Sequence, residues 1–588
     1  MTVKKSLPKF SLMKRASHGH RATTAKITSA TSPATEKDIL RIVPLGGLEE
    51  VGRNSLFIEY KNEIVVIDMG IEFPIEETPG IDFIIPNVTY LESKKENIKA
   101  VVITHGHLDH IGAIPYLMGK LGNPPIYTTL LTKEIINKRQ DEFPNAPKLN
   151  FVIVKGGDQL NISRYFSAEF FGVAHTIPDT TGVVLKTPAG NIANCADFRI
   201  DYDSQGGPLS LEEFERIGKI GIDALLLDST NAEEEGRSIS EREVEKNLEK
   251  LFAEAPNRII LSTFSSMLTR IAEIIKIADK LGRRVAINGY SMKANVQIAQ
   301  NLGYMKFRKD LIVPIEEISK YRDNKILILS TGAQGESKAG LMKIVTGEHQ
   351  HLRIKPGDSV ILSSSVIPGN ERSVQNLKDN LLRQGAKVFT RKFIDIHSSG
   401  HAPQEELKQV IKLIKPRYLV PIHGYYYMRA TCAELGQEVG MHKDNTVVLD
   451  NGEVAELNHE GITITGERVD AFYVMVDGLG VGDVEEVVLR DRKILAQEGM
   501  VVIILTIDKM KPRLLKNPDI ISRGFIYLRE NQEILDEVRK RIRNIILRLG
   551  TQTIDGDYLK TLIRDQVGQY LYTKTKRRPM VLPVVIEV

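Results

Sequence analysis

Short apolar runs bounded by polar or Gly-rich turns begin at residue 39 and continue through the first third of the chain. Residues 41–45, 64–68 and 100–104 are runs of this kind. Their length suits strands better than helices, and β-branched residues dominate them. The pattern therefore predicts buried β-strands with functional loops between them.

The pattern changes between Ile222 and Phe393. Apolar runs now alternate with segments that have helical periodicity, and the clearest of these runs are 224–228, 259–263, 326–330 and 359–363. Strands that alternate with helices are typical of a parallel sheet with helices on its faces. This region is therefore predicted to form an α/β layer of its own.

The last third of the chain has a third pattern. A strand is predicted at 418–422 and closing hairpins at 444–466, followed from about 467 by strands, two amphipathic helices and a terminal strand. One face of the first helix carries Ile534, Val538, Ile542, Ile545, Ile546 and Leu549. Such a face predicts a core or subunit contact.

Composition limits the class of protein. A chain of 588 residues is too long for one hydrophobic core, so three domains or more are expected. No apolar run is long enough to cross a membrane, and the N-terminus lacks the apolar segment of a signal peptide. With Cys195 and Cys432 as the only cysteines, we expect a cytoplasmic protein without a disulfide framework.

Charge is concentrated at the N-terminus. Residues 1–38 hold eight Lys or Arg against Glu36 and Asp38, a net charge of +6. The whole chain has a net charge of +4, so the remainder is about −2. The tail is rich in Ser, Thr, Ala and Lys without apolar periodicity, so it is predicted to be disordered. It is either a solvated tail or a weak attractor of phosphate backbones.

The segment 103–112, ITHGHLDHIG, carries the strongest chemical signal. His105, His107, Asp109 and His110 fall within six residues directly after a predicted strand. Imidazole and carboxylate groups are suitable ligands for zinc or manganese. Six residues cannot complete the coordination of two ions, so more distant ligands are required. His175, Asp197 and His423 each follow an apolar strand, where functional groups are commonly presented.

This order of residues resembles the metallo-β-lactamase motif series, and three later motifs resemble its nucleic-acid-processing β-CASP branch. Asp228 in LLLDST is similar to motif A of that branch, His401 in IHSSGHA to motif B and His423 to motif C. Within the branch, the ribonuclease J family is the most similar, through PLGGLEEVGRN at 44–54, TGAQGE at 331–336, SSSVIPGNE at 363–371 and the terminal KTKRRPMVLPVVIEV.

The resemblance implies an α/β fold with a defined domain order. A metallo-β-lactamase αββα sandwich would comprise residues 39–222 and 390–466, with a parallel α/β β-CASP domain inserted at 223–389. A small α+β C-terminal domain at 467–588 would serve oligomerisation or RNA binding, as a homodimer or homotetramer. RNA-decay proteins or the ribosome are further partners that the resemblance implies, and no membrane is expected.

The resemblance also implies a two-metal centre holding Zn²⁺ or Mn²⁺. One ion would be held by His105, His107 and His175 and the other by Asp109, His110 and His423, with Asp197 bridging both. Asp68 is expected to orient a ligand histidine rather than to bind metal, since carboxylates commonly do this. The family can also carry calcium, and Gly80, Asp82 and Asp477 are the matching positions here; the alternative for these is a solvated acidic loop.

Substrate contacts are expected around the same centre. His401, paired with Asp228, would be a general acid, and Asp197 is the third catalytic candidate. The run His397, Ser398, Ser399, Gly400, His401 resembles a phosphate cradle. Hydroxyls at strand ends could hold a 5′-monophosphate, although each could also cap a helix; these are Ser265, Ser266, Ser363, Ser364 and Ser365.

The resulting hypothesis is a ribonuclease acting in RNA maturation and decay, including rRNA processing and mRNA decay. It would cleave 5′ to 3′ from 5′-monophosphate ends and also internally. The alternatives are a DNA-processing β-CASP nuclease, a small-molecule metallohydrolase and a non-catalytic RNA-binding scaffold. Two departures from the family affect RNA contacts: Tyr425 stands where Glu is usual after PIHG, and Met267 ends the run Phe264–Met267.

Overall fold

The computed structural model describes residues 38–74, 78–203, 207–209, 211–336, 338–367, 369–478, 480–482, 486–508, 513–526, 531–549 and 556–588. The prediction of a disordered tail at 1–38 lies outside the described residues, apart from Asp38. Among the described helices, none combines the length and the apolar character needed to cross a membrane.

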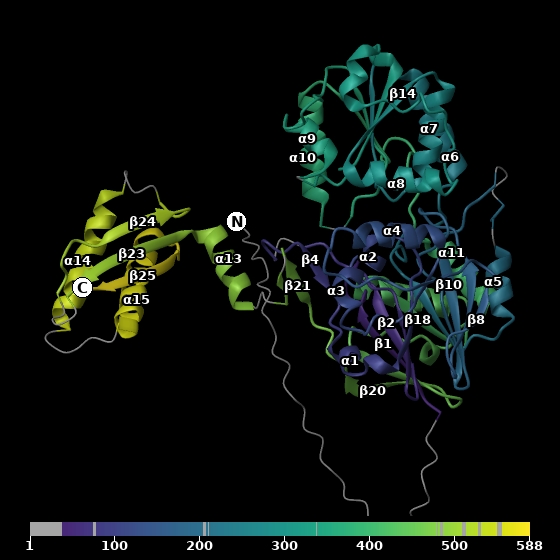
Figure 1. Cartoon of the computed structure of the whole chain (residues 1–588), viewed down its shortest axis with the longest axis horizontal. Helices are drawn as coiled ribbons and strands as arrows, with labels where there is room; N and C mark the ends of the chain where they lie inside the picture. Colours follow the sequence, from purple (N-terminus) through teal and green to yellow (C-terminus); the bar gives the residue numbers. More distant parts are fainter. Residues whose placement is uncertain are drawn as a thin grey trace, which may run out of the picture. The chain divides into compact units, whose positions relative to one another are not determined.

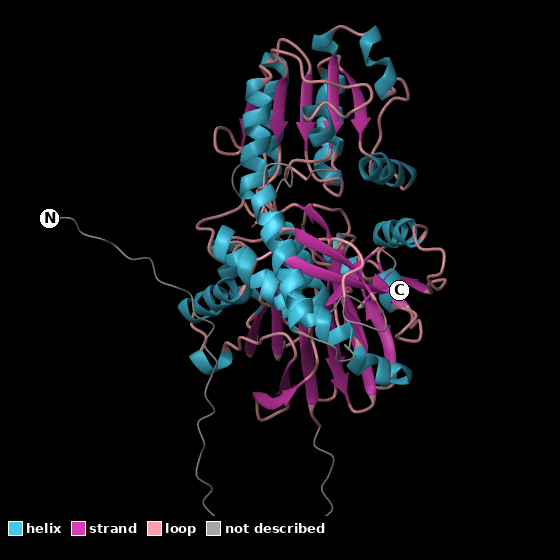
Figure 2. Cartoon of the chain, turned by 90° about the vertical axis from the view of Figure 1, so that its left-hand side faces the viewer, coloured by secondary structure: helices cyan, strands magenta, loops and turns pink. Residues whose placement is uncertain are grey.

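Two sheets packed face to face form the first domain (Figures 1 and 2). In the first sheet the order is β20 (Ile462–Arg468), β19 (Glu453–Leu457), β1 (Leu40–Gly46), β2 (Ser55–Tyr60), β3 (Glu63–Ile67), β5 (Ile98–Val102), β6 (Ile126–Thr128), β7 (Phe151–Ile153). In the second it is β18 (Tyr418–Ile422), β12 (Ala224–Asp228), β11 (Gly190–Asn194), β10 (Thr181–Thr187), β9 (Ser167–Gly172), β8 (Gln159–Asn161).

Alternating side chains fill three apolar layers around these sheets. In β3, Val65 and Ile67 face the second sheet, whereas Ile64 and Val66 face the outer helices. Because a strand's side chains alternate between its faces, a run that is apolar throughout can be covered on both sides. The helices of the two outer layers are α1 (Thr89–Ser93), α2 (Leu108–Ile111), α3 (Ile114–Leu117), α4 (Leu130–Gln140), α5 (Leu211–Gly218), α11 (Gln404–Ile414) and α12 (Tyr426–Glu438).

A parallel sheet forms the inserted domain. Its order is β14 (Arg284–Asn288), β15 (Ile326–Ser330), β13 (Ile259–Ser262), β16 (Ser359–Leu362), β17 (Lys387–Thr390), and every pairing between neighbours is parallel. Helices flank it: α6 (Glu241–Glu254), α7 (Leu268–Lys280), α8 (Tyr290–Asn301), α9 (Gly340–Val345) and α10 (Glu371–Arg383). This is the predicted α/β layer.

One predicted strand was assigned to the wrong sheet. The run 224–228 forms β12, which pairs in parallel with β11 and β18 of the sandwich rather than with the inserted sheet. The insertion therefore begins after Asp228, not at residue 223. The error has a simple cause, because a short apolar strand buried on both faces has the same pattern in any parallel sheet.

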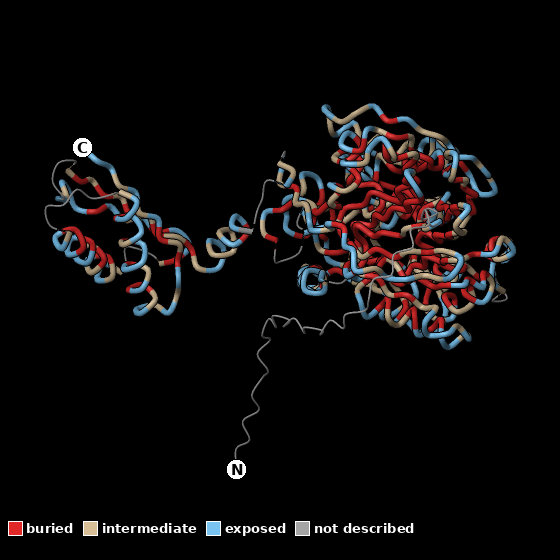
Figure 3. Tube along the Cα trace, turned by 90° about the horizontal axis from the view of Figure 1, so that it is seen from below, coloured by how far each residue is buried: buried red, intermediate tan, exposed pale blue. Residues whose placement is uncertain are grey.

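The C-terminal region contains a sheet of order β24 (Asp519–Arg523), β23 (Met500–Ile507), β25 (Met580–Glu587) and the helices α13 (Glu486–Glu498), α14 (Gln532–Arg548) and α15 (Gly556–Thr575). The predicted apolar face of α14 packs in this domain's own core, with Ile542 fully buried. Figure 3 colours the buried residues along the chain red. A smaller sheet joins β22 (Gly480–Val481), β21 (Val474–Asp477) and β4 (Phe83–Ile85).

Candidate metal centre

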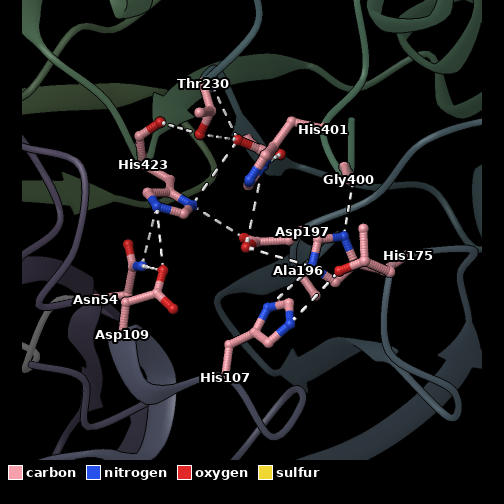
Figure 4. A network of polar contacts seen from close by, with 12 residues as sticks. Asn54, His107, Asp109, His175, Ala196, Asp197, Thr230, Gly400, His401 and His423 are labelled. Carbon is pink, nitrogen blue, oxygen red and sulfur yellow. Dashed lines mark hydrogen bonds and ion pairs between the residues drawn. The ribbon is translucent and has the colours of Figure 1, made fainter. Parts of the chain in front are cut away.

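The seven predicted ligands converge at one end of the sandwich, each carried by the segment that follows a strand. Figure 4 labels five of them, His107, Asp109, His175, Asp197 and His423. His105 and His107 follow β5, and Asp109 and His110 lie in the short helix α2. The remaining three come after β9, β11 and β18, respectively: His175, Asp197 and His423. The fold thus brings together residues separated by more than 300 positions.

Left-handed backbone conformations direct several of these segments into the centre. Asp68 after β3, Ala196 before Asp197, and His423 itself have φ values of 60°, 56° and 53°. L-residues adopt this region at a cost of about 1–3 kcal/mol each, and such residues concentrate at functional sites. The backbone strain therefore falls where side chains must be aimed.

The first ligand set brings three imidazoles together. The Nε2 atoms of His105 and His175 lie 3.0 and 3.1 Å from Nδ1 of His107. Burial lowers the pKa of all three, to about 4 for His107, and the neighbouring histidines contribute. Neutral imidazoles with converging nitrogens cannot all hydrogen-bond to one another, whereas a cation satisfies all of their lone pairs.

The second set surrounds Asp197. Its Oδ2 lies 3.1 Å from His110 Nε2 and its Oδ1 lies 3.0 Å from His423 Nδ1, while His110 Nε2 is 3.4 Å from the Asp109 carboxylate. Burial alone would lower the pKa of His110 and His423, but the surrounding carboxylates outweigh it and raise both. Asp197 belongs to both groups of potential ligands, whose donor atoms lie within 4.8 Å of one another.

Neighbouring groups hold the ligand histidines in orientation, and this supports a fit to metal ions. His105 Nδ1 contacts Thr104 Oγ1 at 3.0 Å, and His175 Nδ1 donates to the carbonyl of Gly400 at 2.7 Å. His110 Nδ1 lies 2.8 Å from Asp68 Oδ2, which is the contact that the predicted orienting role of Asp68 requires. In each case the opposite nitrogen faces the cluster, as ligand histidines require. These residues fit divalent metal ions.

Asn54 is a member of the site that sequence reasoning missed. Its Nδ2 lies 3.1 Å from His110 Nε2, 3.2 Å from His423 Nε2 and 3.3 Å from Asp109 Oδ2. It ends the Gly-rich segment 44–54, which was singled out as a family motif without a role. A polar residue directly before β2 was the available signal.

His401 and Asp228 form the predicted pair beside this cluster. His401 Nδ1 lies 2.7 Å from Asp228 Oδ2, and Thr230 holds the other carboxylate oxygen through Oγ1 at 2.7 Å. Burial opposes the charged imidazole, but Asp228 and Asp197 outweigh it and raise the pKa of His401 to about 9. The side chain is therefore a proton donor at neutral pH.

The serines of the predicted phosphate cradle, His397 to His401, are hydrogen-bonded to neighbouring side chains. Ser398 Oγ accepts from Arg199 at 3.2 Å, and Ser399 Oγ accepts from Asn231 Nδ2 at 2.8 Å. A Cβ on Gly400 would lie 2.5 Å from the His175 ring, so glycine is required there by close approach. His397 differs, because it is buried and its Nδ1 has no hydrogen-bond partner among the described residues.

The predicted serines lie at the carboxyl ends of β13 and β16, which are neighbours in the inserted sheet. Ser363 is fully buried, and its Oγ donates to the carbonyl of Ile396 at 2.7 Å. Ser364 Oγ accepts from Gln334 Nε2 at 3.2 Å, and Ser365 Oγ accepts from Arg391 at 2.9 Å. Ser363 is therefore part of the core, whereas Ser365 is paired with a cationic side chain.

The serines after β13 are accessible, whereas the neighbouring Met267 is buried. Ser265 and Ser266 are partly exposed beside the start of α7. The departure Met267 is buried, and its sulfur accepts from Thr263 Oγ1 at 3.2 Å. Met267 therefore fills the core.

The predicted calcium residues lie together near β21 and β4. Asp82 Oδ2 accepts from the backbone N–H of Gly478 at 2.9 Å. The guanidinium of Arg492 in α13 contacts the Asp477 carboxylate and lies 3.1 Å from the carbonyl oxygen of Gly80. Arg492 thus supplies positive charge where the calcium would lie, and the calcium site stays a prediction.

Four family models match successive parts of the chain. The metallo-β-lactamase superfamily model matches residues 48–190, and the ribonuclease J β-CASP domain model matches 256–381. A Zn-dependent metallo-hydrolase RNA specificity domain matches 385–448, and the ribonuclease J C-terminal domain matches 487–588.

Curated relatives match over nearly the whole length. Ribonuclease J2 of Bacillus subtilis is 35% identical over 552 residues, which cover 93% of this chain and 99% of the relative. Ribonuclease J 1 of Streptococcus pyogenes is 37% identical over 547 residues, which cover 93% and 97%. A solved structure of a protein of unknown function from Enterococcus faecalis has a TM-score of 0.50 at 20% identity and covers 71% of this chain and 100% of its own; it shows the fold alone.

Proposed function

This chain belongs to the ribonuclease J family of metal-dependent ribonucleases, and we propose that it hydrolyses RNA phosphodiester bonds at a centre of two divalent ions, Zn²⁺ or Mn²⁺. The observation that carries the two-ion proposal is the shared carboxylate, because Asp197 Oδ2 lies 3.7 Å from His105 Nε2 of the first set and 3.1 Å from His110 Nε2 of the second. Two ions bound there would activate a water and neutralise charge on the phosphoryl oxygens.

Protein groups supply the remaining steps. The seven ligands would hold the two ions, whose positive charge would position the scissile phosphate, and Asn54 offers an amide donor next to Asp109 and His423. His401, protonated and oriented by Asp228, donates its Nε2 proton to the leaving 3′-oxygen. Thr230 fixes Asp228 in turn, so that the imidazole keeps one orientation throughout the reaction.

We further propose 5′→3′ exonuclease activity with a preference for 5′-monophosphate ends, together with internal cleavage. Support comes from the polar groups at the ends of β13 and β16, where Ser365 and Arg391 are paired and His397 keeps an unsatisfied nitrogen. Burial lowers the pKa of His397, and the positive charges of Arg270, Arg391 and Arg199 lower it further. Because Arg270 and Arg199 pair with Glu241, Arg391 is the cation that supports binding of an anion here.

Matched oligomers test this activity. RNA and DNA of one sequence, each with a 5′-monophosphate, 5′-triphosphate or 5′-hydroxyl, are incubated with the full chain and with His401→Ala. We expect cleavage of RNA, faster from the monophosphate end, and a loss of about 10²–10⁴-fold in the variant. Equal cleavage of DNA would favour the DNA-processing alternative. Hydrolysis of small esters without any nuclease activity would favour the small-molecule hydrolase.

We also propose self-association through the C-terminal domain, as a dimer or tetramer. One face of its sheet is apolar and partly exposed, with Leu582, Val584 and Ile586 of β25 each more than 40% exposed. Apolar patches of this kind mark association surfaces. We place the protein in the cytoplasm, consistent with two buried, unpaired cysteines, and expect RNA-decay proteins or the ribosome as further partners.

Light scattering tests the association. Val584→Lys places a charge on the apolar face and should reduce the mass to that of a monomer. Lys560→Ala, an exposed change in α15, is the control. An unchanged mass in Val584→Lys would place the contact elsewhere.

A further inference from the structure

Two stacked tyrosine rings lie beside the metal centre. Tyr425 comes two residues after His423, and its ring stacks on that of Tyr427 with centroids 6.0 Å apart and planes 8° apart. Consecutive Cα atoms are 3.8 Å apart, so the Cα atoms of His423 and Tyr425 are within about 7.6 Å. The stack is thus fixed to the start of α12, next to a candidate ligand.

The stack is available to a partner. Tyr427 is 46% exposed, and Tyr425 is partly exposed. Aromatic rings normally bury their faces, so a stacked pair left at the surface offers a flat apolar face at little cost in side-chain entropy. None of the proposed catalytic steps uses either ring.

A third exposed ring contacts the Gly-rich segment before β2. Tyr473 is 51% exposed, and the Arg53 guanidinium lies 4.7 Å from its centroid. Arg53 directly precedes Asn54, which contacts His423. Exposed aromatic rings therefore lie beside two separate segments that carry residues of the metal centre, the turn after β18 and the Gly-rich segment before β2.

The charges around the rings favour a base over a phosphate. Glu371 acts on Tyr425 and Glu233 acts on Tyr427, although burial of each ring is the larger influence on its pKa. Glu72 is not part of this charge, because burial and Glu50 raise its own pKa to about 8. Carboxylates repel the sugar-phosphate backbone. A nucleobase is neutral and has a π-face, so it can stack there without charge repulsion.

We infer that Tyr425 and Tyr427 form a base-stacking platform for a nucleotide of single-stranded RNA close to the scissile bond. This subsite rests on the proposed ribonuclease function. Stacking is sequence-tolerant, and the platform would therefore hold any base.

Steady-state kinetics on single-stranded RNA test the platform. Tyr427→Ala should raise KM about ten-fold with little change in kcat, since stacking on one ring is worth about that factor. Tyr427→Phe should keep the KM of the unaltered chain. Tyr558→Ala, which removes a similarly exposed ring from α15, should also leave it unchanged.

Substrates with one modified nucleotide separate stacking from a structural role. An abasic nucleotide, moved stepwise along the RNA, should raise KM at one position near the cut in the unaltered chain but not further in Tyr427→Ala. 2-Aminopurine at that position should lose fluorescence on binding to the unaltered chain. Equal losses of Tyr427→Ala on intact and abasic RNA, or no quenching at any position, would overturn the platform. Absence of RNA cleavage by the unaltered chain would instead overturn the proposed function.

Discussion

The metal centre and the serine loop of the inserted domain are both polar clusters at strand ends, yet their hydrogen bonding differs. In the metal centre, His105, His107 and His175 direct nitrogens at one another that cannot all be satisfied. In the serine loop, the hydroxyls of Ser363 and Ser364 are paired with Ile396 and Gln334. The first cluster needs a cation, whereas much of the second is already satisfied.

This difference shows which polar clusters identify a ligand. Buried polar groups are nearly always hydrogen-bonded, so converging acceptors without donors indicate a missing positive charge. A row of serines carries no such information, because each hydroxyl can satisfy a neighbour. Two residues in this region resemble the metal centre more closely. Ser365, in the serine loop of residues 363–365, has the cationic partner Arg391, and His397, which follows β17, has an unpaired nitrogen.

The largest effect is expected from the ligands themselves. His107→Ala removes the nitrogen on which two other imidazoles converge, so metal content should fall and RNA cleavage should drop by about a thousand-fold or more. Elemental analysis and initial rates measure both. His442→Ala, an exposed histidine, is the control. Full activity at reduced metal content would show that catalysis does not need a cation at the histidine cluster, and the contrast with the serines would no longer hold.

Asp228→Asn should give the next largest effect, on the order of a hundred-fold. With Asp228 present, the pKa of His401 is raised to about 9, so the imidazole is protonated below that pH and cleavage is lost as pH rises through it. Removing the carboxylate lowers this pKa. The alkaline limb of the pH–rate profile should therefore move to lower pH, and an unmoved limb would exclude His401 as the acid.

Much of the fold followed from local pattern. The predicted strands at 41–45, 64–68 and 100–104 correspond to β1, β3 and β5 within one or two residues. The hairpin at 444–466 appears as β19 and β20. The assignment of β12 failed because strand pairing is a long-range property, and its partner β18 lies almost 200 residues later.

The residues of the site also divide into those that local spacing or the family resemblance predicted and one that depends on long-range contacts. His105 to His110 were recognisable because their spacing is local, and the family resemblance supplied the distant ligands. Asn54 was missed because its contacts depend on the left-handed turn at Arg53 and on the approach of Asp109. Gly400 was interpreted as part of a phosphate cradle, although its size is set by the His175 ring.

Gly400→Ala tests how tightly the metal centre depends on its surroundings. The new Cβ would displace the His175 ring and lengthen its bond to the Gly400 carbonyl, so metal affinity and activity should fall about 10–100-fold. Gly466→Ala is the control, because no atom lies within 4 Å of its added Cβ. Metal titration followed by cleavage assays gives both values. Unchanged metal affinity would show that the metal centre does not depend on the close approach of Gly400 to His175.

A smaller and more selective effect is expected in the serine loop. Ser364→Val together with Ser365→Val removes two hydroxyls near the proposed 5′-phosphate, and charge-assisted hydrogen bonds contribute about 1.5–3 kcal/mol each. The preference for a 5′-monophosphate over a 5′-hydroxyl should fall about ten-fold, while internal cleavage should persist. An undiminished preference would place the pocket elsewhere, and an equal fall in internal cleavage would indicate a structural role.

Ser363→Ala should have the smallest effect, and it separates one serine from its neighbours. Ser363 Oγ donates to Ile396 and lies 3.3 Å from Arg270 Nη1, which keeps its ion pair with Glu241. Losing one such bond costs about 1 kcal/mol, so the melting temperature should fall by a few degrees. Cleavage and 5′-end preference should stay within about two-fold, because no substrate reaches a fully buried hydroxyl. A loss of end preference equal to that of the double variant would mean that this serine also contacts the phosphate, and that the two clusters differ less than their hydrogen bonds indicate.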